Sequence, residues 1–227
     1  MMASTPAESA LALGIDIGGT KIAVALVDAS GTVLARARGP VAPESNDAAV
    51  ASIFAVVDQL LASEANARQR LSGIGAGAPG SIDWRRGVFG GATNLAWRDL
   101  ALADSLRERY GVPALLDNDV NVAAWGELSF GGWSVPIQNL VFIAVGTGIG
   151  CGIIESGRIV RGRRSAGEIG HIPIFEHGPQ CKCGMIGCLE AVASGPALGS
   201  VARALVEQGG GDALLGAARA AGGGIEQ

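Results

Sequence analysis

The pattern of apolar residues along the chain begins with three short runs. Leu11–Ile17, Lys21–Val27 and Thr32–Arg36 are rich in aliphatic and β-branched residues, and they are separated by Gly18-Gly19 and by residues 28–31. Runs of this kind divided by turn residues are typical of hairpins. The pattern therefore predicts three antiparallel strands at the start of the fold.

Helical spacing follows this meander. Over residues 46–69 the apolar positions recur three or four apart and predict a helix with Ser45 or Asn46 as its N-cap; these positions are Val50, Ile53, Phe54, Val57, Leu60 and Leu61. Further helices are expected over 99–110, 119–128 and about 191–208, and further strands over 71–77 and 112–117. This alternation is typical of an α/β protein.

The opening pattern returns in the second half of the chain. Strands are expected over 139–145, 149–155 and 158–160, again with a glycine turn after the first of them. This weak internal repeat suggests two related α/β lobes. We expect a disordered N-terminus over 1–10, a first lobe over 11–118 and a second lobe over 119–227. Because no strand is expected after the last helix, the second lobe looks incomplete.

Composition and charge exclude several classes of protein. Hydrophobic residues make up 48% and charged residues 17% of the 227 residues, which excludes disorder for most of the chain. The formal net charge of −4 argues against a nucleic-acid-binding surface. The longest uncharged apolar stretch, Leu140–Ile154, is shorter than a membrane helix of roughly 20 residues. With no signal peptide at the N-terminus, we expect a cytoplasmic protein without a membrane partner.

Glycine is over-represented, and two glycine turns are candidates for phosphate binding. There are 36 glycines, and two clusters lie between expected strands, in Asp16-Ile-Gly-Gly-Thr-Lys21 and in Gly146-Thr-Gly-Ile-Gly150. Glycines let a backbone approach a phosphate closely, and a neighbouring carboxylate can hold Mg²⁺ through water. Both segments can equally be ordinary hairpin turns. The formal G-x-G-x-x-G match over 75–80 contains Pro79 and precedes no helix, so we discount it as a dinucleotide site.

Polar side chains gather where one strand meets one helix. Asp117, Asn118, Asp119 and Asn121 lie between an apolar strand and an apolar helix. An N-cap would explain one of them. Four in five positions suit hydrogen bonding to a polyhydroxyl ligand, with one carboxylate as a base.

Three of the four cysteines lie close together. Cys181, Cys183 and Cys188 follow the segment Glu168-Ile-Gly-His171. Three thiolates and one imidazole are the donor set of a closed, four-coordinate zinc site. His177 is an alternative ligand; we prefer His171 because it lies three residues after Glu168. Three incidental thiols remain the alternative.

Together these motifs resemble the ROK family of bacterial sugar kinases, repressors and related proteins. The resemblance rests on Asp16-Ile-Gly-Gly-Thr-Lys21, Asn118-Asp119, Glu168-x-x-His171 and Cys181-x-Cys-Gly-x-x-Gly-Cys-x-Glu190, and it covers residues 11–208. It implies an actin-like, hexokinase-like (ribonuclease H-like) fold of two lobes, a homodimer or homotetramer, and ATP-dependent phosphorylation of a hexose. Glucose is the first expectation, and another hexose, an amino sugar or a non-catalytic sugar-binding role are alternatives. Since few residues precede Leu11, no DNA-binding role is expected.

The resemblance also implies the roles of individual residues. Asp119 matches the catalytic base that takes the proton from the sugar hydroxyl. The sugar-binding positions would be Asn94, Asn118, Asp119, Glu168, His171 and Glu190. The nucleotide and its Mg²⁺ would be held by Asp16, Gly18, Gly19, Thr20, Lys21, Gly146, Thr147 and Gly148. A structural Zn²⁺ within 168–190 would be bound by His171, Cys181, Cys183 and Cys188.

Overall fold

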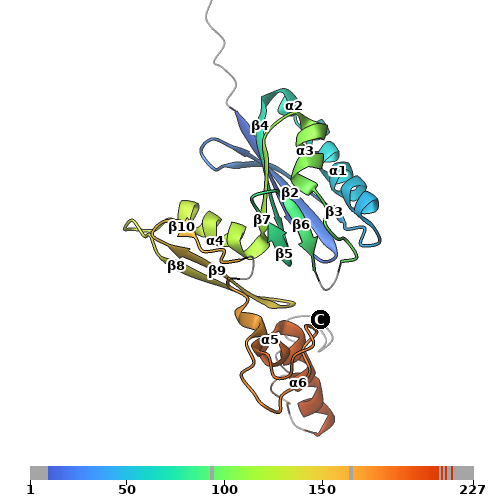
Figure 1. Ribbon diagram of the computed structural model, residues 1–227, viewed down its shortest axis with the longest axis vertical. Helices are drawn as coiled ribbons and strands as arrows, with labels where there is room; N and C mark the ends of the chain where they lie inside the picture. The colour runs from blue at the N-terminus through green and yellow to red at the C-terminus, as the bar shows by residue number, and fades with distance from the viewer. Residues whose placement is uncertain are drawn as a thin grey trace, which may run out of the picture. The chain divides into compact units, whose positions relative to one another are not determined.

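A computed structural model describes residues 10–92, 95–163 and 166–209, together with Gly211, Ala213 and Gly216. The chain divides into two compact units. The first unit contains residues 1–140 and 152–165, and the second contains residues 141–151 and 166–227. Each unit is described by itself below (Figure 1).

The first unit is built on a five-stranded sheet with the order β3-β2-β1-β4-β7. Its strands are β1 (Leu11–Ile17), β2 (Lys21–Asp28), β3 (Val33–Pro40), β4 (Leu71–Ala78) and β7 (Ala114–Asn118). The first three strands are antiparallel, as the sequence predicts, and β4 and β7 add to β1 in parallel. Alternate residues of β1 are buried, so one face of the sheet forms the core.

Helices α1 (Asn46–Ser63) and α3 (Leu102–Tyr110) cover the core face of this sheet (Figure 1). The hydroxyl of Ser45 accepts a hydrogen bond from the Ala48 amide and caps α1, as predicted. The predicted helix over 46–69 is not continuous, because the chain leaves the helix at Glu64. It resumes as α2 (Ala67–Arg70) after Asn66, whose φ of 56° is a conformation that asparagine tolerates.

Helix α4 (Asp119–Phe130) packs on the opposite face of the sheet, against β4 and β7. Gly77 of β4 makes this contact possible. A Cβ atom at that position would lie 3.2 Å from the Cα of Asp119 and 3.5 Å from a methyl group of Val122. The first turn of α4 therefore lies directly against the backbone of β4.

A short hairpin follows β4 where the sequence analysis expects no element. It consists of β5 (Ser81–Asp83) and β6 (Val88–Gly91) and begins after Gly80, which has a φ of +82°. Strands of three and four residues carry too little periodicity to be recognised in a sequence. The absence of a helix after Gly80 confirms that 75–80 is not a dinucleotide fingerprint.

The repeated meander forms a second sheet with the order β10-β9-β8. It contains β8 (Leu140–Val145), β9 (Ile149–Glu155) and β10 (Arg158–Ile159), close to the predicted ranges. Residues 141–151 of this sheet belong to the second unit, which continues with the 3₁₀ turn η1 (Ile169–His171) and helices α5 (Leu189–Ala193) and α6 (Gly195–Glu207). The helix predicted over 191–208 is interrupted at Ser194, because Pro196 has no amide hydrogen and its ring would clash with the carbonyl four residues earlier, so it fits only in the first turn of a new helix.

Within the described part of the chain, no helix has both the length and the apolar character that crossing a membrane requires.

Candidate functional site

A row of three residues crosses the first sheet below helix α4. Asp16 of β1 is in register with Gly77 of β4, which is in register with Asp117 of β7. Residues in one such row point to the same face of a sheet, and neighbouring strands lie about 4.8 Å apart. Because the start of α4 rests on Gly77 on this same face, the carboxylates of Asp16, Asp117 and Asp119 gather at one end of the sheet.

The carboxylate of Asp119 is the chemically distinctive member of this group. Burial raises its pKa, the amide of Val120 lowers the pKa by donating to Oδ1 at 2.9 Å, and the charge of Asp16 raises the pKa further. No cation forms an ion pair with Asp119 among the described residues. A carboxylate that is half-buried, close to another acid and without a cation has an increased affinity for a proton, as a general base requires.

The Asn118 side chain caps helix α4. Its Oδ1 accepts hydrogen bonds from the amides of Val120 and Asn121, and its Nδ2 donates to the Gly80 carbonyl at 3.3 Å. The N-cap interpretation therefore accounts for Asn118. The same contacts fix the start of α4 to the turn that follows β4, so Asn118 positions its neighbour Asp119.

Asp117 is neutralised by an arginine that the sequence analysis did not single out. Its Oδ2 accepts hydrogen bonds from Nε and Nη2 of Arg161 at 2.7 and 2.6 Å, and both side chains are mostly buried. Its Oδ1 accepts hydrogen bonds from the Asn118 amide and from Nδ2 of Asn121. Asp117 and Asn121 are thus engaged within the protein. No sequence spacing links residue 161 to residue 117, because their contact depends on the tertiary fold.

The first glycine hairpin lies beside this acidic row. The amide of Gly18 donates to the Lys21 carbonyl at 2.8 Å, and the Thr20 carbonyl accepts from the Val41 amide. The side chains of Asp16, Thr20 and Lys21 are exposed, while Gly18 and Gly19 are half-buried. A Cβ at Gly18 would lie 3.2 Å from the Lys21 carbonyl, so this turn is tight. These are the residues predicted to hold the nucleotide phosphates.

The second glycine hairpin, in the second unit, is supported by a carboxylate. Oε2 of Glu190 accepts a hydrogen bond from the Ile149 amide at 2.9 Å. A Cβ at Gly148 would lie 2.5 Å from this oxygen, so glycine leaves the space that the carboxylate occupies. The Gly146 amide donates to the Gly148 carbonyl, and the Gly146 carbonyl accepts from the Gly195 amide. Glu190, predicted as a sugar ligand, therefore also holds this turn.

Two glycines allow the segment 166–171 to pack on strand β9. A Cβ at Gly167 would lie 1.9 Å from the Cys151 carbonyl oxygen, and a Cβ at Gly170 would lie 2.2 Å from the Ile149 carbonyl oxygen. Gly167 also has a φ of +91°, a conformation in which glycine is favoured. This close packing orders the chain on both sides of Glu168 and places His171 in the 3₁₀ turn η1.

The predicted metal ligands come together in the second unit. One ligand atom from each of His171, Cys181, Cys183 and Cys188 lies within 4.8 Å of all the others. Nδ1 of His171 is 3.6 Å from Sγ of Cys181, and Sγ of Cys183 is 3.7 Å from Sγ of Cys188. These separations match the edges of a tetrahedron around Zn²⁺, which are about 3.8 Å for Zn–S bonds of 2.3 Å. The donor set therefore fits zinc, and it contains His171 and not His177.

Local turns bring the thiols together. The Gly184 amide donates to the Cys181 carbonyl, and the Cys181 amide donates to the Met185 carbonyl. The Met185 backbone lowers the pKa of the Cys183 thiol, whereas burial raises the pKa of Cys188 to about 12. A metal ion would favour the thiolate form of all three cysteines.

The predicted site residues are divided between the two units. Asp16, Gly18, Gly19, Thr20, Lys21, Asn118 and Asp119 belong to the first unit, whereas Gly146, Thr147, Gly148, Glu168, His171 and Glu190 belong to the second. Asn94, predicted as a sugar ligand, lies outside the described residues. Sequence reasoning did not identify Gly77, although its place in a glycine-rich buried strand is a signal of close backbone approach.

Comparison with known proteins agrees with the resemblance described in the sequence analysis. The model of the family described as "ROK family" matches residues 12–220. The chain is 38% identical over 193 residues to a protein named glucokinase from Halalkalibacterium halodurans, covering 84% of this chain and 58% of that protein. It is 35% identical over 201 residues to a putative xylose repressor from Caldicellulosiruptor, covering 88% of this chain and 50% of that protein. The chain thus spans between half and three fifths of the length of these relatives.

Among solved structures, a ROK family glucokinase from Streptomyces griseus in complex with glucose and AMPPNP matches with a TM-score of 0.79 at 34% identity. The match covers 95% of this chain and 67% of that one. The actin-like, hexokinase-like fold expected from the sequence is thereby confirmed.

Proposed function

The chain belongs to the ROK family, and we propose that it phosphorylates a hexose with ATP, with glucose as the first candidate. The observation that carries this proposal is the environment of Asp119. Its carboxylate lies at the start of α4 against the backbone of β4, has a raised pKa and forms no ion pair within the described chain. The solved relative with glucose and an ATP analogue supports the same assignment.

Asp119 accepts the proton of the attacking sugar hydroxyl in this proposal. General-base assistance of this type contributes roughly 10²–10⁴-fold to the rate. Asn118 is a positioning residue, since its side chain joins the first turn of α4 to Gly80. Neutralisation of Asp117 by Arg161 limits the negative charge next to the base. These contacts fix the position of the Asp119 backbone, from which its carboxylate would accept the proton.

The two glycine hairpins bind the nucleotide phosphates in this proposal. Their backbone amides donate hydrogen bonds to phosphate oxygens, and Lys21 adds a positive charge. The exposed carboxylate of Asp16 would hold Mg²⁺, which when bound would supply neutralisation of the phosphate charge.

Sugar recognition is assigned to Asn94, Asn118, Glu168, His171 and Glu190, following the family motifs. Zn²⁺ held by His171 and the three cysteines would fix the orientation of the imidazole. Its contribution would be structural, because His171 and the three cysteines supply as many ligands as a closed structural zinc site requires.

A coupled assay with glucose, ATP and Mg²⁺ tests the proposal. We expect Asp119→Asn to lower kcat by roughly 10²–10⁴-fold while glucose binding, measured by calorimetry, changes little. Fructose, N-acetylglucosamine and N-acetylmannosamine assayed in parallel define the sugar. Full turnover by Asp119→Asn would contradict the role of this carboxylate.

The similarity to a putative xylose repressor favours a second candidate, a ROK protein that binds sugar without catalysis. Saturable sugar binding combined with no nucleotide binding would support this alternative. Turnover that Asp119→Asn abolishes would exclude it.

A further inference from the structure

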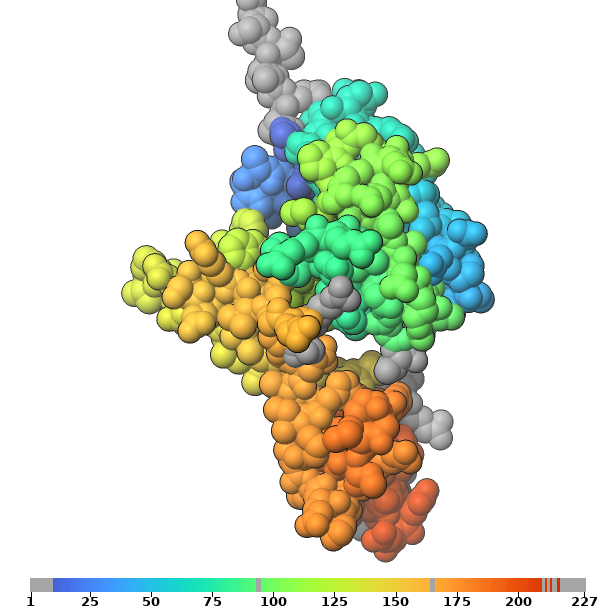
Figure 2. Space-filling model, viewed as in Figure 1, coloured from blue at the N-terminus to red at the C-terminus, as the bar shows by residue number. Residues whose placement is uncertain are grey.

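A pocket lined by cations lies in the first unit, and none of its lining residues is among those assigned above. It is formed by the turn between β5 and β6 and by the segment that follows β10. Both of these parts of the chain lie at the surface seen in Figure 2, where their colours can be read from the bar. Its volume is about 570 Å³. The lining residues are Asp83, Trp84, Arg85, Arg86, Gly162 and Arg163.

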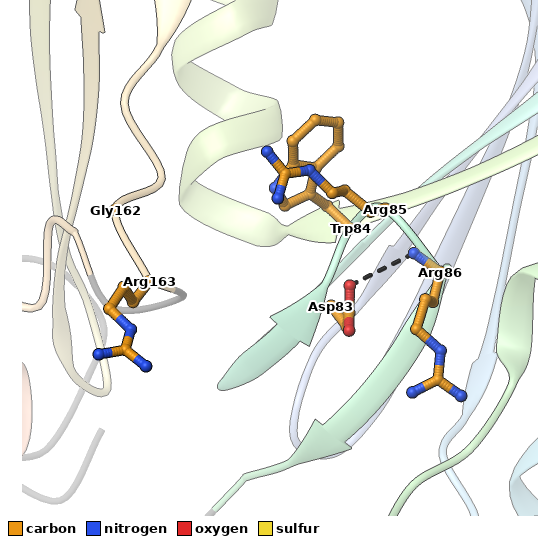
Figure 3. Close-up of a pocket in the computed structure, with 6 residues that line it drawn as sticks. All are labelled: Asp83, Trp84, Arg85, Arg86, Gly162 and Arg163. Carbon is orange, nitrogen blue, oxygen red and sulfur yellow. Dashed lines mark hydrogen bonds between the residues drawn. The ribbon is translucent and has the colours of Figure 1, made fainter.

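The lining carries an excess of positive charge. Three arginines and one aspartate give a formal charge of 3 − 1 = +2. Arg85, Arg86 and Arg163 form no ion pair with any carboxylate of the described chain. Asp83 accepts a hydrogen bond from the backbone amide of Arg86, which holds the turn together (Figure 3). The pocket thus offers cations that no carboxylate of the described residues neutralises.

The Trp84 ring contacts one of these cations, Arg85, and also Arg161, which is bound to the acidic row. The guanidinium of Arg161 lies 4.2 Å from the centre of the Trp84 ring, and that of Arg85 lies 5.2 Å from it. Arg161 is also bound to Asp117, so it is not available to a ligand. Trp84 remains 39% exposed. Its ring is therefore held in place and can contact the body of a bound molecule.

We propose that this pocket binds the phosphate monoester of a small metabolite. A monoester carries a charge close to −2 at neutral pH, which matches the charge of the lining. Arginine presents paired donors that fit phosphate oxygens, and Arg163 lies on the other side of the pocket from the turn that carries Arg85 and Arg86 (Figure 3). The volume accommodates a sugar-sized body beside Trp84. The lining of this pocket contains neither Asp119 nor a residue of the two glycine hairpins.

Calorimetric titration of the chain with glycerol 3-phosphate, glucose 6-phosphate and orthophosphate tests the proposal. Glycerol 3-phosphate separates the pocket from a hexose site, because it carries no sugar ring. The variant Arg85→Ala/Arg163→Ala removes two lining cations. Arg36→Ala/Arg38→Ala is its matched control, because it changes the net charge equally at exposed positions of β3. A third variant, Trp84→Leu, removes the ring.

We expect Arg85→Ala/Arg163→Ala to weaken binding of both monoesters by about tenfold or more, and the control to weaken it less than about twofold. Trp84→Leu should weaken glucose 6-phosphate more than orthophosphate. Equal affinities of both double variants, no saturable binding by the wild-type chain, or orthophosphate binding as tightly as the monoesters would each overturn the proposal. Thermal melting of every variant confirms that it is folded.

Discussion

The two glycine hairpins of this chain are similar in sequence but differ in what supports them. The hairpin at Gly18-Gly19 is closed by main-chain hydrogen bonds, from the Gly18 amide to the Lys21 carbonyl and from the Val41 amide to the Thr20 carbonyl. The hairpin at 146–150 adds a side chain, since Glu190 accepts from the Ile149 amide. Glu190 lies two residues after Cys188, one of the four candidate metal ligands.

This difference indicates that the two hairpins have different sources of order. The first is part of the central sheet and depends on the hydrophobic core beneath it. The second depends on a segment that follows four potential metal ligands and contains little buried apolar surface within the described residues. Conditions that disturb the metal site should therefore affect the second hairpin and leave the first intact.

Metal removal is expected to have the largest effect. After chelation, backbone amides over 172–190 and at Ile149 should exchange with solvent on the order of 100-fold faster or more, while amides of β1 and β4 keep their protection. Hydrogen-exchange mass spectrometry measures both regions in one experiment, and elemental analysis identifies the metal beforehand. Equal loss of protection in both regions would show that the metal supports the whole fold.

Substitutions of two glycines with nearly equal φ values make the comparison sharper. Gly187 in the second unit and Gly111 in the first have φ values of +73° and +71°. A Cβ at Gly187 would lie 1.7 Å from the Phe175 carbonyl oxygen, whereas nothing lies within 4 Å at Gly111. We expect Gly111→Ala to cost about 1–2 kcal/mol for the left-handed conformation alone.

Gly187→Ala should cost more than about 3 kcal/mol of local stability, because the steric clash adds to the conformational cost. Hydrogen exchange in each unit measures the two effects. Similar costs for both substitutions would mean that the backbone at Phe175 moves away from residue 187 with little loss of stability.

Glu190→Gln should have a smaller and more local effect. The substitution keeps the size of the side chain but replaces a charged acceptor with a neutral one, which weakens the hydrogen bond from Ile149 by about 1 kcal/mol. We expect faster exchange of the Ile149 amide and no change at Gly18. A change at both amides would remove the distinction between the hairpins.

The smallest expected effect concerns pH and lies in the first unit. Because the pKa of Asp119 is raised by burial and by Asp16, its ionised form destabilises the fold, and this cost appears as pH rises through the raised pKa. Asp119→Asn should therefore increase Tm slightly at pH 7 and leave it unchanged below pH ~3.8, the usual aspartate pKa. Thermal unfolding across this pH range checks the sign. A loss of stability at pH 7 would contradict it.

Much of the fold follows from local pattern. The strands of the opening meander, helix α1 with its Ser45 cap and the left-handed Gly111 at the end of α3 agree with periodicity and capping signals. The β5–β6 hairpin cannot be recognised in the sequence, because strands of three and four residues are too short to show a period of two. Pro196 is a local signal for the start of a new helix, and the predicted continuous helix over 191–208 did not take it into account.

The sequence predicts the residues of the candidate site only where they lie close together in the chain. The cysteine cluster and the Asp117–Asn121 segment are visible as spacings, and the structure brings the four predicted metal ligands together. The ion pair between Arg161 and Asp117 joins residues 44 positions apart. The need for glycine at position 77 becomes clear only from the close packing of helix α4 on this residue. Such contacts depend on the topology of the sheet, which a single sequence does not encode locally.

The ion pair between Asp117 and Arg161 limits how the two units can be produced separately. The first unit takes residues 152–165 from beyond the stretch 141–151 that belongs to the second, so the backbone passes from one unit to the other three times. A fragment cut after Leu140 would lose Arg161 and leave Asp117 as a mostly buried acid without its counter-ion. Neither unit can be isolated by a single cut, and a permuted or joined chain that restores 152–165 is needed to study the first one alone.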